Sequence, residues 1–308
     1  MTEQKNGKPA RGGDSAPDGL VVVDKPAGFT SHDVVAKMRG IARTRRVGHA
    51  GTLDPMATGV LVLGIGRATR LLGHLALTEK EYVATVRLGQ NTVTDDAEGD
   101  LTSSTPAHGL SREAVDAAVA LQTGAVMQVP SKVSAVKVDG KRSYARVREG
   151  EEVELAARPV TISSFLVHDV REERAEDGTP VTDLLITVTC SSGTYVRAIA
   201  RDLGAELGVG GHLTALRRTR VGPYGVAEAR TLEQFQESLE VMPLATAAAK
   251  AFPRWDLPER EAKLLCHGVR LAMPELPAGP VAAFGPDGRF LALVEERGGK
   301  AKSLAVFA

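Results

Sequence analysis

The chain has 308 residues, of which 43% are hydrophobic and 25% charged, and its 38 basic side chains equal its 38 acidic ones. These values are typical of a folded protein and exclude a disordered chain. Two cysteines without a Cys-x-x-Cys pair exclude a zinc ribbon and argue against a disulfide framework, which favours a cytoplasmic location. No secretory signal begins the sequence and no apolar run approaches about 18 residues, so a membrane protein is not expected.

The length predicts about two domains, at about 150 residues each. Residues 1–18 are polar, unpatterned and rich in Gly, Pro and Ser, and we predict a disordered tail. Gly48, Gly51 and Pro55, together with Gly59 directly after them, predict a loop over 44–58. Ser31 is the predicted N-cap of a helix, and Thr231 caps a further short helix. The remaining patterns predict strands over 19–23, 60–65, 82–88, 160–170, 184–190 and 212–221, and helices over 32–43, 69–77, 111–121 and 194–207.

Two later segments differ in composition from the rest. Residues 130–158 form a basic stretch between two prolines, which predicts an excursion from the core, with a hairpin and a short helix. The composition changes again near 242–258, and a helix over 259–266 and strands over 281–284, 289–294 and 303–307 are expected beyond it. We therefore predict a small β-rich C-terminal domain over 252–308. Because helices and strands are mixed without strict alternation, the fold class is α+β.

Basic residues gather in three windows of this neutral chain, namely 34–53, 131–148 and 195–220. Together the windows hold 16 Lys or Arg and only three Asp or Glu. Such a distribution permits a face that binds a polyanion such as nucleic acid. Three ordinary solvated faces would give the same counts, and charge alone leaves both interpretations open.

Generic nucleotide, metal and hydrolase motifs are not found. Gly64-x-Gly66-x-x-Thr69 imitates a dinucleotide fingerprint, but its third position is neither Gly nor Ala and no suitable acidic residue follows. The histidines form no His-x-x-x-His pair, which argues against a zinc hydrolase. Ser191-Ser192-Gly193 is not the nucleophile elbow of an α/β-hydrolase. We therefore predict neither a metal nor a cofactor.

The segment 45–59 is the strongest candidate for chemistry. Its glycines allow close approach of the backbone to a ligand, and the basic residues at its start suit phosphate. Asp54 is the only carboxylate between Asp33 and Glu79, and the following proline favours an extended backbone for it. An Asp-Pro turn on the surface is the alternative interpretation.

Five ordered motif blocks cover about residues 19–225. The central block is Gly48-His49-x-Gly51-Thr52-Leu53-Asp54-Pro55-x-Ala57-Thr58-Gly59. The others are Asp24-Lys25-Pro26-x-Gly28; Lys80-Glu81-Tyr82 with Leu88-Gly89-x-x-Thr92-x-Thr94-x-Asp96-x-x-Gly99; Pro130-Ser131-x-x-Ser134-Ala135-x-Lys137-x-x-Gly140 with Tyr144; and Cys190-Ser191-x-Gly193-Thr194-Tyr195-Val196-Arg197 with His212-Leu213-x-x-Leu216-Arg217-Arg218. In these blocks the chain resembles the TruB family of pseudouridine synthases, which act on uridine 55 of tRNA.

The resemblance implies a catalytic domain over 19–250, with a mixed, largely antiparallel central sheet flanked by helices and loops. It also implies a PUA-like domain over 252–308. The family's isomerase reaction breaks the N1–C1′ bond of a uridine, rotates the base and forms a C5–C1′ bond, without cofactor or metal. The expected partner is the T-arm of tRNA, whose target base must be flipped out of its stack. The enzyme is expected to be a monomer without protein partners, and the 130–158 excursion is expected to clamp the RNA.

The resemblance also assigns roles to single residues. Asp54 maps to the nucleophile, which attacks the sugar C1′ or the base C6 or assists glycal formation; the sequence leaves these open. Arg197 maps to the arginine that pairs with this aspartate, and Tyr82 to a tyrosine that stacks on the flipped uracil. The residues expected to bind or support the substrate are His49, Tyr195, Leu216, Lys25, Gly51 and Thr52. Those expected to contact the RNA backbone are Arg45, Arg46, Lys132, Lys137, Lys141 and Arg142.

Three rival functions remain beside the enzyme. A tRNA-binding folding chaperone would use the same scaffold with catalysis secondary, but it has no need of Asp54 in a basic loop. A relative that depends on a guide RNA is disfavoured by the compact chain without a long basic tail. A nucleotide-binding enzyme would rest on the imitation at Gly64 alone.

Overall fold

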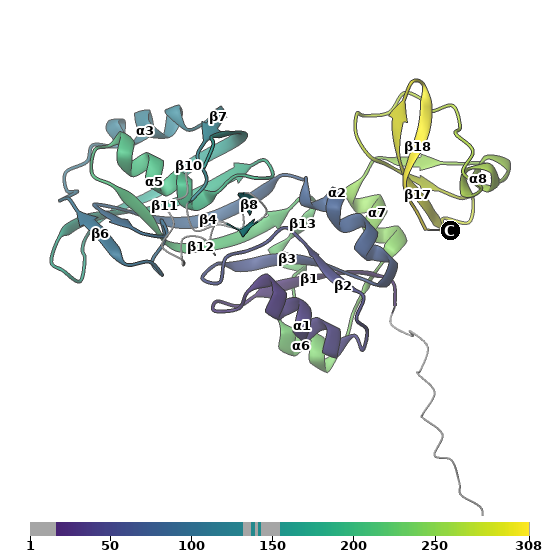
Figure 1. The fold of residues 1–308 in the computed structure, drawn as a ribbon, viewed down its shortest axis with the longest axis horizontal. Helices are drawn as coiled ribbons and strands as arrows, with labels where there is room; N and C mark the ends of the chain where they lie inside the picture. The colour runs from purple at the N-terminus through teal and green to yellow at the C-terminus, as the bar shows by residue number, and fades with distance from the viewer. Residues whose placement is uncertain (1–16, 132–136, 139–140, 143–154, 308) are drawn as a thin grey trace, which may run out of the picture.

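The computed structural model describes residues 17–131, 137–138, 141–142 and 155–307, and it has the expected α+β architecture. A ten-stranded sheet runs through the larger part of the molecule (Figure 1). Its main order is β14-β1-β3-β12-β4-β11-β10-β7, with β2 paired to β3 and β13 paired to β12. These strands are β1 (Gly19–Lys25), β2 (Val47–Ala50), β3 (Thr58–Ile65), β4 (Lys80–Leu88), β7 (Gly124–Gln128), β10 (Arg158–Arg174), β11 (Pro180–Cys190), β12 (Gly211–Val221), β13 (Tyr224–Gly225) and β14 (Met242–Pro243).

The pairs within this sheet are antiparallel apart from β3 and β12, which run parallel. The sheet is therefore mixed and largely antiparallel, as predicted. Two hairpins stand beside it: β5 (Gln90–Thr92) with β6 (Leu101–Ser104), and β8 (Lys137–Val138) with β9 (Lys141–Arg142). The second hairpin lies in the basic excursion, where a hairpin was expected.

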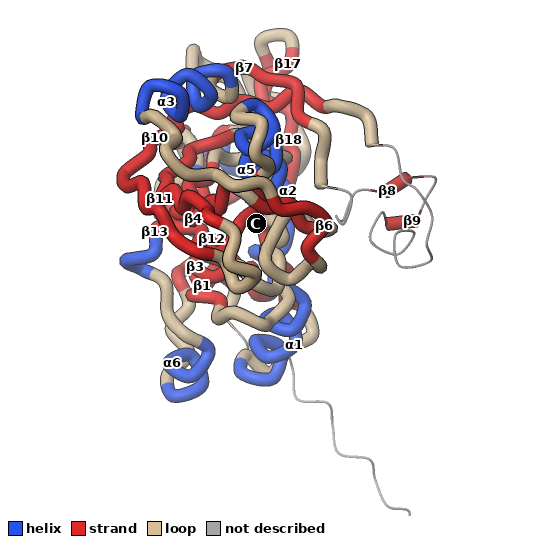
Figure 2. The backbone as a smooth tube through the Cα atoms, turned by 90° about the vertical axis from the view of Figure 1, so that its left-hand side faces the viewer, coloured by secondary structure: helices blue, strands red, loops and turns tan. Residues whose placement is uncertain are grey.

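Helices cover the large sheet at its two ends. Helix α3 (Arg112–Leu121) and α5 (Val196–Glu206) lie at one end, and α1 (Ser31–Ile41) lies beside α6 (Leu232–Glu237) near β1 at the other (Figure 2). Two shorter segments, η1 (Gly66–Leu71) and η2 (Val226–Glu228), are 3-10 helices. None of the helices in the described ranges is long and apolar enough to cross a bilayer.

A four-stranded sheet forms the C-terminal β-rich domain, at the opposite end of the molecule from α3 and α5 (Figure 1). Its strands are β15 (Arg254–Asp256), β16 (Val281–Phe284), β17 (Phe290–Arg297) and β18 (Lys300–Val306), and α8 (Glu259–Cys266) packs on β17. Helix α2 (Leu72–Ala76) and α7 (Leu244–Ala251) lie between the two sheets. An apolar cluster that includes Leu72, Phe252 and Phe307 joins them.

Alternation along β4 decides which of its side chains face the core. Lys80, Tyr82, Ala84, Val86 and Leu88 are buried, and the residues between them are half-exposed. The period of two places these five residues on one face of the sheet. The strand therefore carries Tyr82 inward, together with an apolar row.

Several predicted boundaries were wrong in informative ways. Thr30, not Ser31, is the N-cap of α1: its hydroxyl accepts from the Asp33 amide, whose carboxylate accepts in return from the Thr30 amide. The predicted loop over 44–58 contains β2, because four of its residues pair with β3. The predicted helix over 69–77 begins as a 3-10 turn at Gly66. The helix predicted over 194–207 begins at Val196 instead.

Strands β7 and β15 were not predicted, since they are only five and three residues long. Asp18, assigned to the disordered tail, accepts hydrogen bonds from the backbone and side chain of Arg67. The rest of the predicted tail, residues 1–16, lies outside the described residues.

Candidate active site

The segment with Asp54 links β2 to β3 and is held by two buried polar side chains. The Ser31 hydroxyl accepts from the Leu53 amide at 2.9 Å and donates to the Leu53 carbonyl at 3.3 Å. The ammonium of Lys25 is fully buried and donates to the carbonyls of Pro26, Phe29 and Pro55 at 3.0, 2.6 and 3.1 Å. Burial lowers the pKa of Lys25 to about 8. The two residues next to Asp54, Leu53 and Pro55, are thus held in place by hydrogen bonds from Ser31 and Lys25.

Asp54 pairs with Arg197 from the first turn of α5. Arg197 Nη2 donates to Asp54 Oδ1 at 3.2 Å, and Nε lies 3.0 Å from Oδ2. The arginine side chain is only 5% exposed, whereas that of Asp54 is 36% exposed. This side-on pair fixes both carboxylate oxygens and leaves the carboxylate accessible from solvent.

The other side of the Arg197 guanidinium is held by the turn between β5 and β6. Its Nη1 donates to the Thr94 carbonyl at 2.9 Å and lies 3.3 Å from Asp96 Oδ2. Asp96 is almost completely buried, and it also accepts from the Thr94 hydroxyl and the Glu98 amide. A buried arginine between two carboxylates has little freedom to move, because leaving either carboxylate strands a charge.

A second buried arginine, Arg218, supports the same loop from β12. Its side chain donates to the carbonyl of Val60 at 2.7 Å, of Gly51 at 3.2 Å and of Thr52 at 3.3 Å. Gly59 faces the Arg218 backbone where β3 and β12 run parallel, and a Cβ atom at this position would collide with the Arg218 carbonyl. The glycine therefore permits the strand contact that brings Arg218 under the loop.

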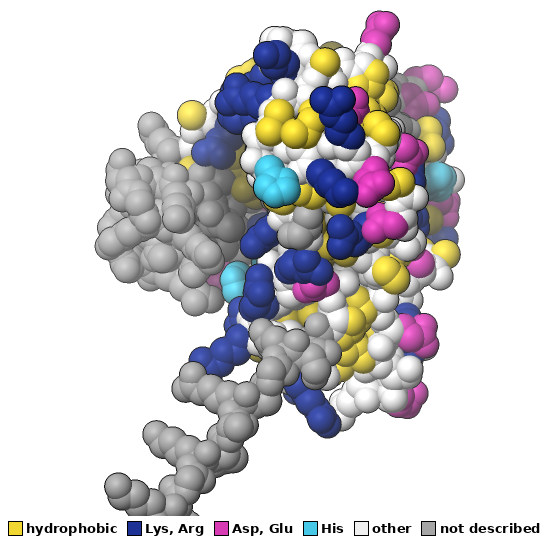
Figure 3. Space-filling view, turned by 90° about the vertical axis from the view of Figure 1, so that its right-hand side faces the viewer, with side chains coloured by type: hydrophobic (Ala, Val, Ile, Leu, Met, Phe, Trp, Pro, Cys, Tyr) yellow, Lys and Arg dark blue, Asp and Glu magenta, His cyan; other side chains and the backbone are white. Residues whose placement is uncertain are grey.

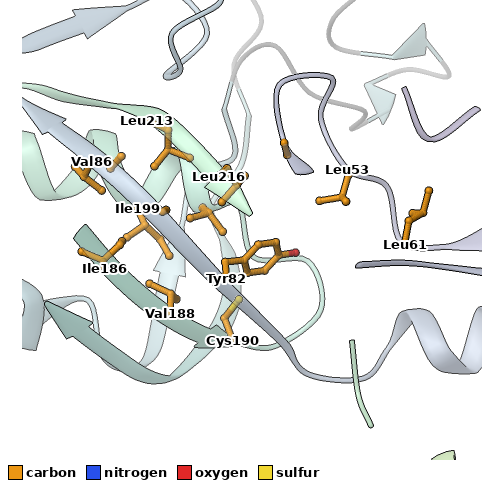
Figure 4. Close-up of a cluster of buried hydrophobic side chains, with 14 of the residues drawn as sticks. Leu53, Leu61, Tyr82, Val86, Ile186, Val188, Cys190, Ile199, Leu213 and Leu216 are labelled. Carbon is orange, nitrogen blue, oxygen red and sulfur yellow. The ribbon is translucent and has the colours of Figure 1, made fainter. Parts of the chain in front are cut away.

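Tyr82 lies at the edge of the apolar core (Figure 4). Its ring is beside Leu216 and Cys190, and its hydroxyl points toward the segment that carries Leu53. Burial raises the pKa of Tyr82, which keeps the phenol neutral at physiological pH, while the positive charge of Arg218 acts in the opposite direction. Tyr82 is only 7% exposed and nevertheless lines a cavity beside Asp54.

Lys80 precedes Tyr82 by two residues and lies on the same face of β4. Its ammonium donates to the carbonyls of Ala76 and Thr78, at 2.7 and 2.6 Å, at the end of α2. Burial lowers the pKa of Lys80 to about 8, and the nearby Arg218 adds to the effect.

A cavity of about 270 Å³ brings most of the predicted site residues together. Tyr195 stands at its wall and is the N-cap residue of α5; its backbone exchanges two hydrogen bonds with the Gln128 side chain, at 2.8 and 3.1 Å. The lining residues are Gly51, Thr52, Leu53, Asp54, Ala76, Lys80, Tyr82, Ser192, Gly193, Thr194, Tyr195, Val196, Arg197, Leu216 and Arg218.

Two predicted substrate-binding residues do not line this cavity. Lys25 lies beneath the Asp54 loop, where it supports the backbone. His49 is on β2, and its ring meets the edge of His32 at a centroid distance of 5.5 Å and an interplanar angle of 80°. Burial, and secondarily the charge of His32, lower the pKa of His49.

The predicted RNA-backbone residues are only partly described. Arg45 and Arg46 are exposed in the turn that precedes β2. Lys132 lies outside the described residues, and the side chains of Lys137, Lys141 and Arg142, on β8 and β9, are not described. No group of three or more His, Cys, Asp or Glu side chains in the described ranges is arranged to hold a metal ion.

Three site residues were missed by reasoning from the sequence. Asp96, Lys80 and Arg218 were quoted within motif blocks but received no role. A signal existed for Lys80, because alternation places it on the face of Tyr82. No signal in the sequence distinguished Arg218 from an exposed arginine on a strand.

Family models match nearly the whole chain. The model described as TruB family pseudouridylate synthase (N terminal domain) matches residues 39–196. The model of the tRNA pseudouridylate synthase B C-terminal domain matches residues 197–247, and that of tRNA Pseudouridine synthase II, C terminal, matches 252–308. The chain belongs to the TruB family. Its motif blocks, its sheet and the cavity around Asp54 are therefore those of a pseudouridylate synthase family member.

Similar proteins from other organisms extend over almost the full chain. A protein of Streptomyces griseus subsp. griseus named tRNA pseudouridine synthase B is 77% identical over 294 residues, which are 96% of this chain and 98% of that one. A protein of Streptomyces coelicolor with the same name is 71% identical over 295 residues, 95% of this chain and 98% of its own.

Among solved structures, a Cbf5-Nop10-Gar1 complex contains a similar chain. That chain is 26% identical with a TM-score of 0.69, and the match covers 94% of this chain and 84% of the other. A chain in an H/ACA RNP bound to a substrate RNA containing 2′-deoxyuridine, 23% identical with a TM-score of 0.69, shares the fold over 94% of this chain and 85% of its own.

Proposed function

We propose that this enzyme converts uridine 55 in the T-loop of tRNA to pseudouridine, with Asp54 as the nucleophile. The observation that carries the proposal is the Asp54–Arg197 pair at the wall of the 270 Å³ cavity. The name tRNA pseudouridine synthase B, carried by relatives of 77% and 71% identity, supports tRNA as the substrate.

The reaction is an isomerisation in which one bond replaces another. The N1–C1′ bond of the uridine breaks, the base turns within the site, and a C5–C1′ bond forms as C5 loses its proton to water and N1 takes up a proton. The target base must first leave its stack, at a cost of about a few kcal/mol. The cavity is lined by Tyr82, Tyr195 and Leu216. Their aromatic and apolar surfaces can contact the flipped base, which offsets part of that cost.

Asp54 is suited to attack because it is oriented and accessible. Arg197 donates to one carboxylate oxygen and lies beside the other, which fixes the direction of the carboxylate. Attack at C1′ gives an ester with the sugar as the base departs; attack at C6 gives an ester with the base. A carboxylate stabilises a developing positive charge at C1′ in either case, and also in a glycal route.

Tyr82 is the candidate that stacks against the uracil ring, while the C5 proton is lost to water. Burial keeps its phenol neutral, so the residue first serves as a stacking surface and hydrogen-bond donor. The site residues Gly51 and Thr52 present backbone beside Asp54, and Arg218 binds their carbonyls.

RNA contacts beyond the cavity follow from the charge distribution. Exposed Arg45 and Arg46 and the basic segment 130–158 would bind phosphates of the T-arm. The C-terminal domain, proposed as a PUA-like unit over 252–308 beside a catalytic domain over 19–250, would contact RNA further from the target base. We expect the enzyme to act as a monomer in the cytoplasm.

The decisive test is tritium release from a tRNA transcript labelled with [5-³H]uridine. Wild type is expected to release tritium, and Asp54→Asn, which keeps the side-chain shape, is expected to bind the transcript but release none. Asp116→Asn on the exposed face of α3 is the matched control and should behave as wild type. Binding without release by wild type would contradict the proposal and leave an RNA-folding chaperone; full release by Asp54→Asn would exclude Asp54 as nucleophile.

A further inference from the structure

Two arginines on successive turns of α5 contact two adjacent aspartates. Arg197 and Arg201 are four residues apart and therefore share one helix face. Arg197 Nη1 lies 3.3 Å from Asp96 Oδ2, and Arg201 Nη1 lies 3.2 Å from Asp95 Oδ2. Two ion pairs thus join the turn between β5 and β6 to α5. Of the two arginines, only Arg197 also contacts Asp54.

Asp95 has an unusual backbone conformation that explains how the turn serves Arg197. Its φ is +59°, a left-handed conformation that Asp and Asn tolerate better than most residues. Its carbonyl accepts from the Leu213 amide of β12 at 3.1 Å, while its carboxylate reaches Arg201 on α5. Held at both ends, Asp95 directs the preceding Thr94 carbonyl and the following Asp96 carboxylate toward Arg197.

Arg201 also holds a third element, the chain directly after β7. Its Nη2 donates to the Val129 carbonyl at 2.7 Å. The preceding residue, Gln128, bonds the backbone of Tyr195 at the start of α5. Arg201 further pairs with Asp202 at 2.8 Å, and its side chain is 26% exposed. It does not line the cavity.

We infer that Arg201 is a positioning residue: through Asp95 it sets the turn that orients Arg197, and Arg197 in turn orients Asp54. The inference rests on the proposed function. Its physical basis is that a reacting group displaced by about 1 Å loses up to about 100-fold in rate, whereas the affinity for RNA depends on the more distant phosphate contacts. Arg201 therefore affects the chemical step and leaves RNA binding nearly unchanged.

The test separates the chemical step from binding. Tritium release from a [5-³H]uridine-labelled T-arm hairpin is followed in single turnover with enzyme in excess, and Kd is measured by filter binding. For Arg201→Ala we expect a rate about tenfold or more below wild type, with Kd within about twofold. Arg201→Lys should recover part of the rate, because an ammonium still pairs with Asp95. Arg112→Ala, which removes an exposed arginine of α3, is the control and should match wild type.

Asp95→Asn tests the other end of the link. Asn keeps the left-handed turn and removes only the charge, so its rate should fall in the same way. The double variant Arg201→Ala/Asp95→Asn should be no slower than the slower single variant, because both changes break one link.

The inference is overturned by three results: a wild-type rate for Arg201→Ala, a multiplied loss in the double variant, or an increase in Kd at an unchanged rate, which would make Arg201 a phosphate contact. If Arg201→Ala does not fold, Arg201→Lys and Asp95→Asn decide by the same criteria. Absence of release by wild type defeats the proposed function instead, so the two failures are distinguishable.

Discussion

The large sheet and the C-terminal domain handle charged side chains in opposite ways. Within the described residues, every buried polar or charged side chain lies in the part of the chain from Lys25 to Arg218. The ion pairs of the C-terminal domain are exposed instead: Lys263 and Glu259 are 70% and 74% exposed, and Arg289 and Asp287 are 69% and 60% exposed. Figure 3, which faces the right-hand side of Figure 1, shows Lys and Arg on the surface with Asp and Glu close to several of them.

The difference reflects what each region has to do. Burying Lys25, Arg197 or Arg218 costs desolvation free energy, which is recovered only if every donor finds an acceptor in the right place. Such groups define the geometry of the Asp54 loop narrowly, as a reaction requires. The C-terminal sheet is held by apolar packing around Trp255 and Leu265, and its surface charges are free to adjust. Buried charged side chains are therefore characteristic of the region around Asp54. The C-terminal domain combines an apolar core with exposed charged side chains.

The largest effect expected from this comparison follows replacement of a buried arginine. Arg218→Met leaves three loop and strand carbonyls without their donor, and we expect a loss of about 3 kcal/mol in the free energy of unfolding together with loss of activity. Urea unfolding followed by far-UV circular dichroism measures the loss. The single tryptophan, Trp255, reports separately on the C-terminal domain, and its transition should move less. An unchanged circular dichroism midpoint would refute the supporting role of Arg218.

A smaller effect concerns the pH dependence of stability. Burial lowers the pKa of Lys80 to about 8, whereas an unfolded lysine titrates near 10.5. Between these values the unfolded chain binds more protons than the folded one, so the contribution of Lys80 to stability rises with pH and is lost as the pH falls through about 8. The stability of wild type relative to Lys80→Met should therefore increase by about 1 to 2 kcal/mol from pH 7.5 to 9.5.

The measurement is urea unfolding of both proteins at the two pH values. Lys80→Arg serves as the matched variant, because its side chain stays charged throughout. Its free energy of unfolding should not show the increase with pH that Lys80 produces. If wild type and Lys80→Met differ in the free energy of unfolding by the same amount at pH 7.5 and 9.5, burial does not lower the pKa of Lys80.

The same contrast explains what the sequence could and could not predict. The Asp54 loop, Arg197 and Tyr82 were recognised because they lie in contiguous motifs, whereas the burial of Tyr82 on β4 is known only from the structure. The partners of Arg218 were not predictable, because the carbonyls it binds are 158 to 167 residues away along the chain. Only the parallel contact of β3 with β12 brings them together.

Local rivals also misled the predictions. Ser31 and Thr30 are both good N-cap residues. The sequence does not reveal that the Ser31 hydroxyl is hydrogen-bonded to the Leu53 backbone instead. Likewise β2 is four residues long and includes Gly48, so no strand pattern is visible until β3 pairs with it. In the C-terminal domain, α8 was predicted with its observed bounds, because its amphipathic pattern depends on neighbours three and four residues away.

The smallest expected effect sharpens the comparison by applying the same substitution in the other region. Lys263 pairs with Glu259 one turn earlier on α8, and both side chains are largely exposed. The ion pair is screened by solvent and salt, so Lys263→Met should leave the urea midpoint unchanged within error at pH 7.5 and at 9.5, in low and in high salt. Trp255 fluorescence is the local probe, since its ring packs in the same apolar cluster as Leu265 of α8. A pH-dependent change as large as that of Lys80→Met would mean that exposure, the property that separates the two regions, does not govern what a lysine contributes to stability.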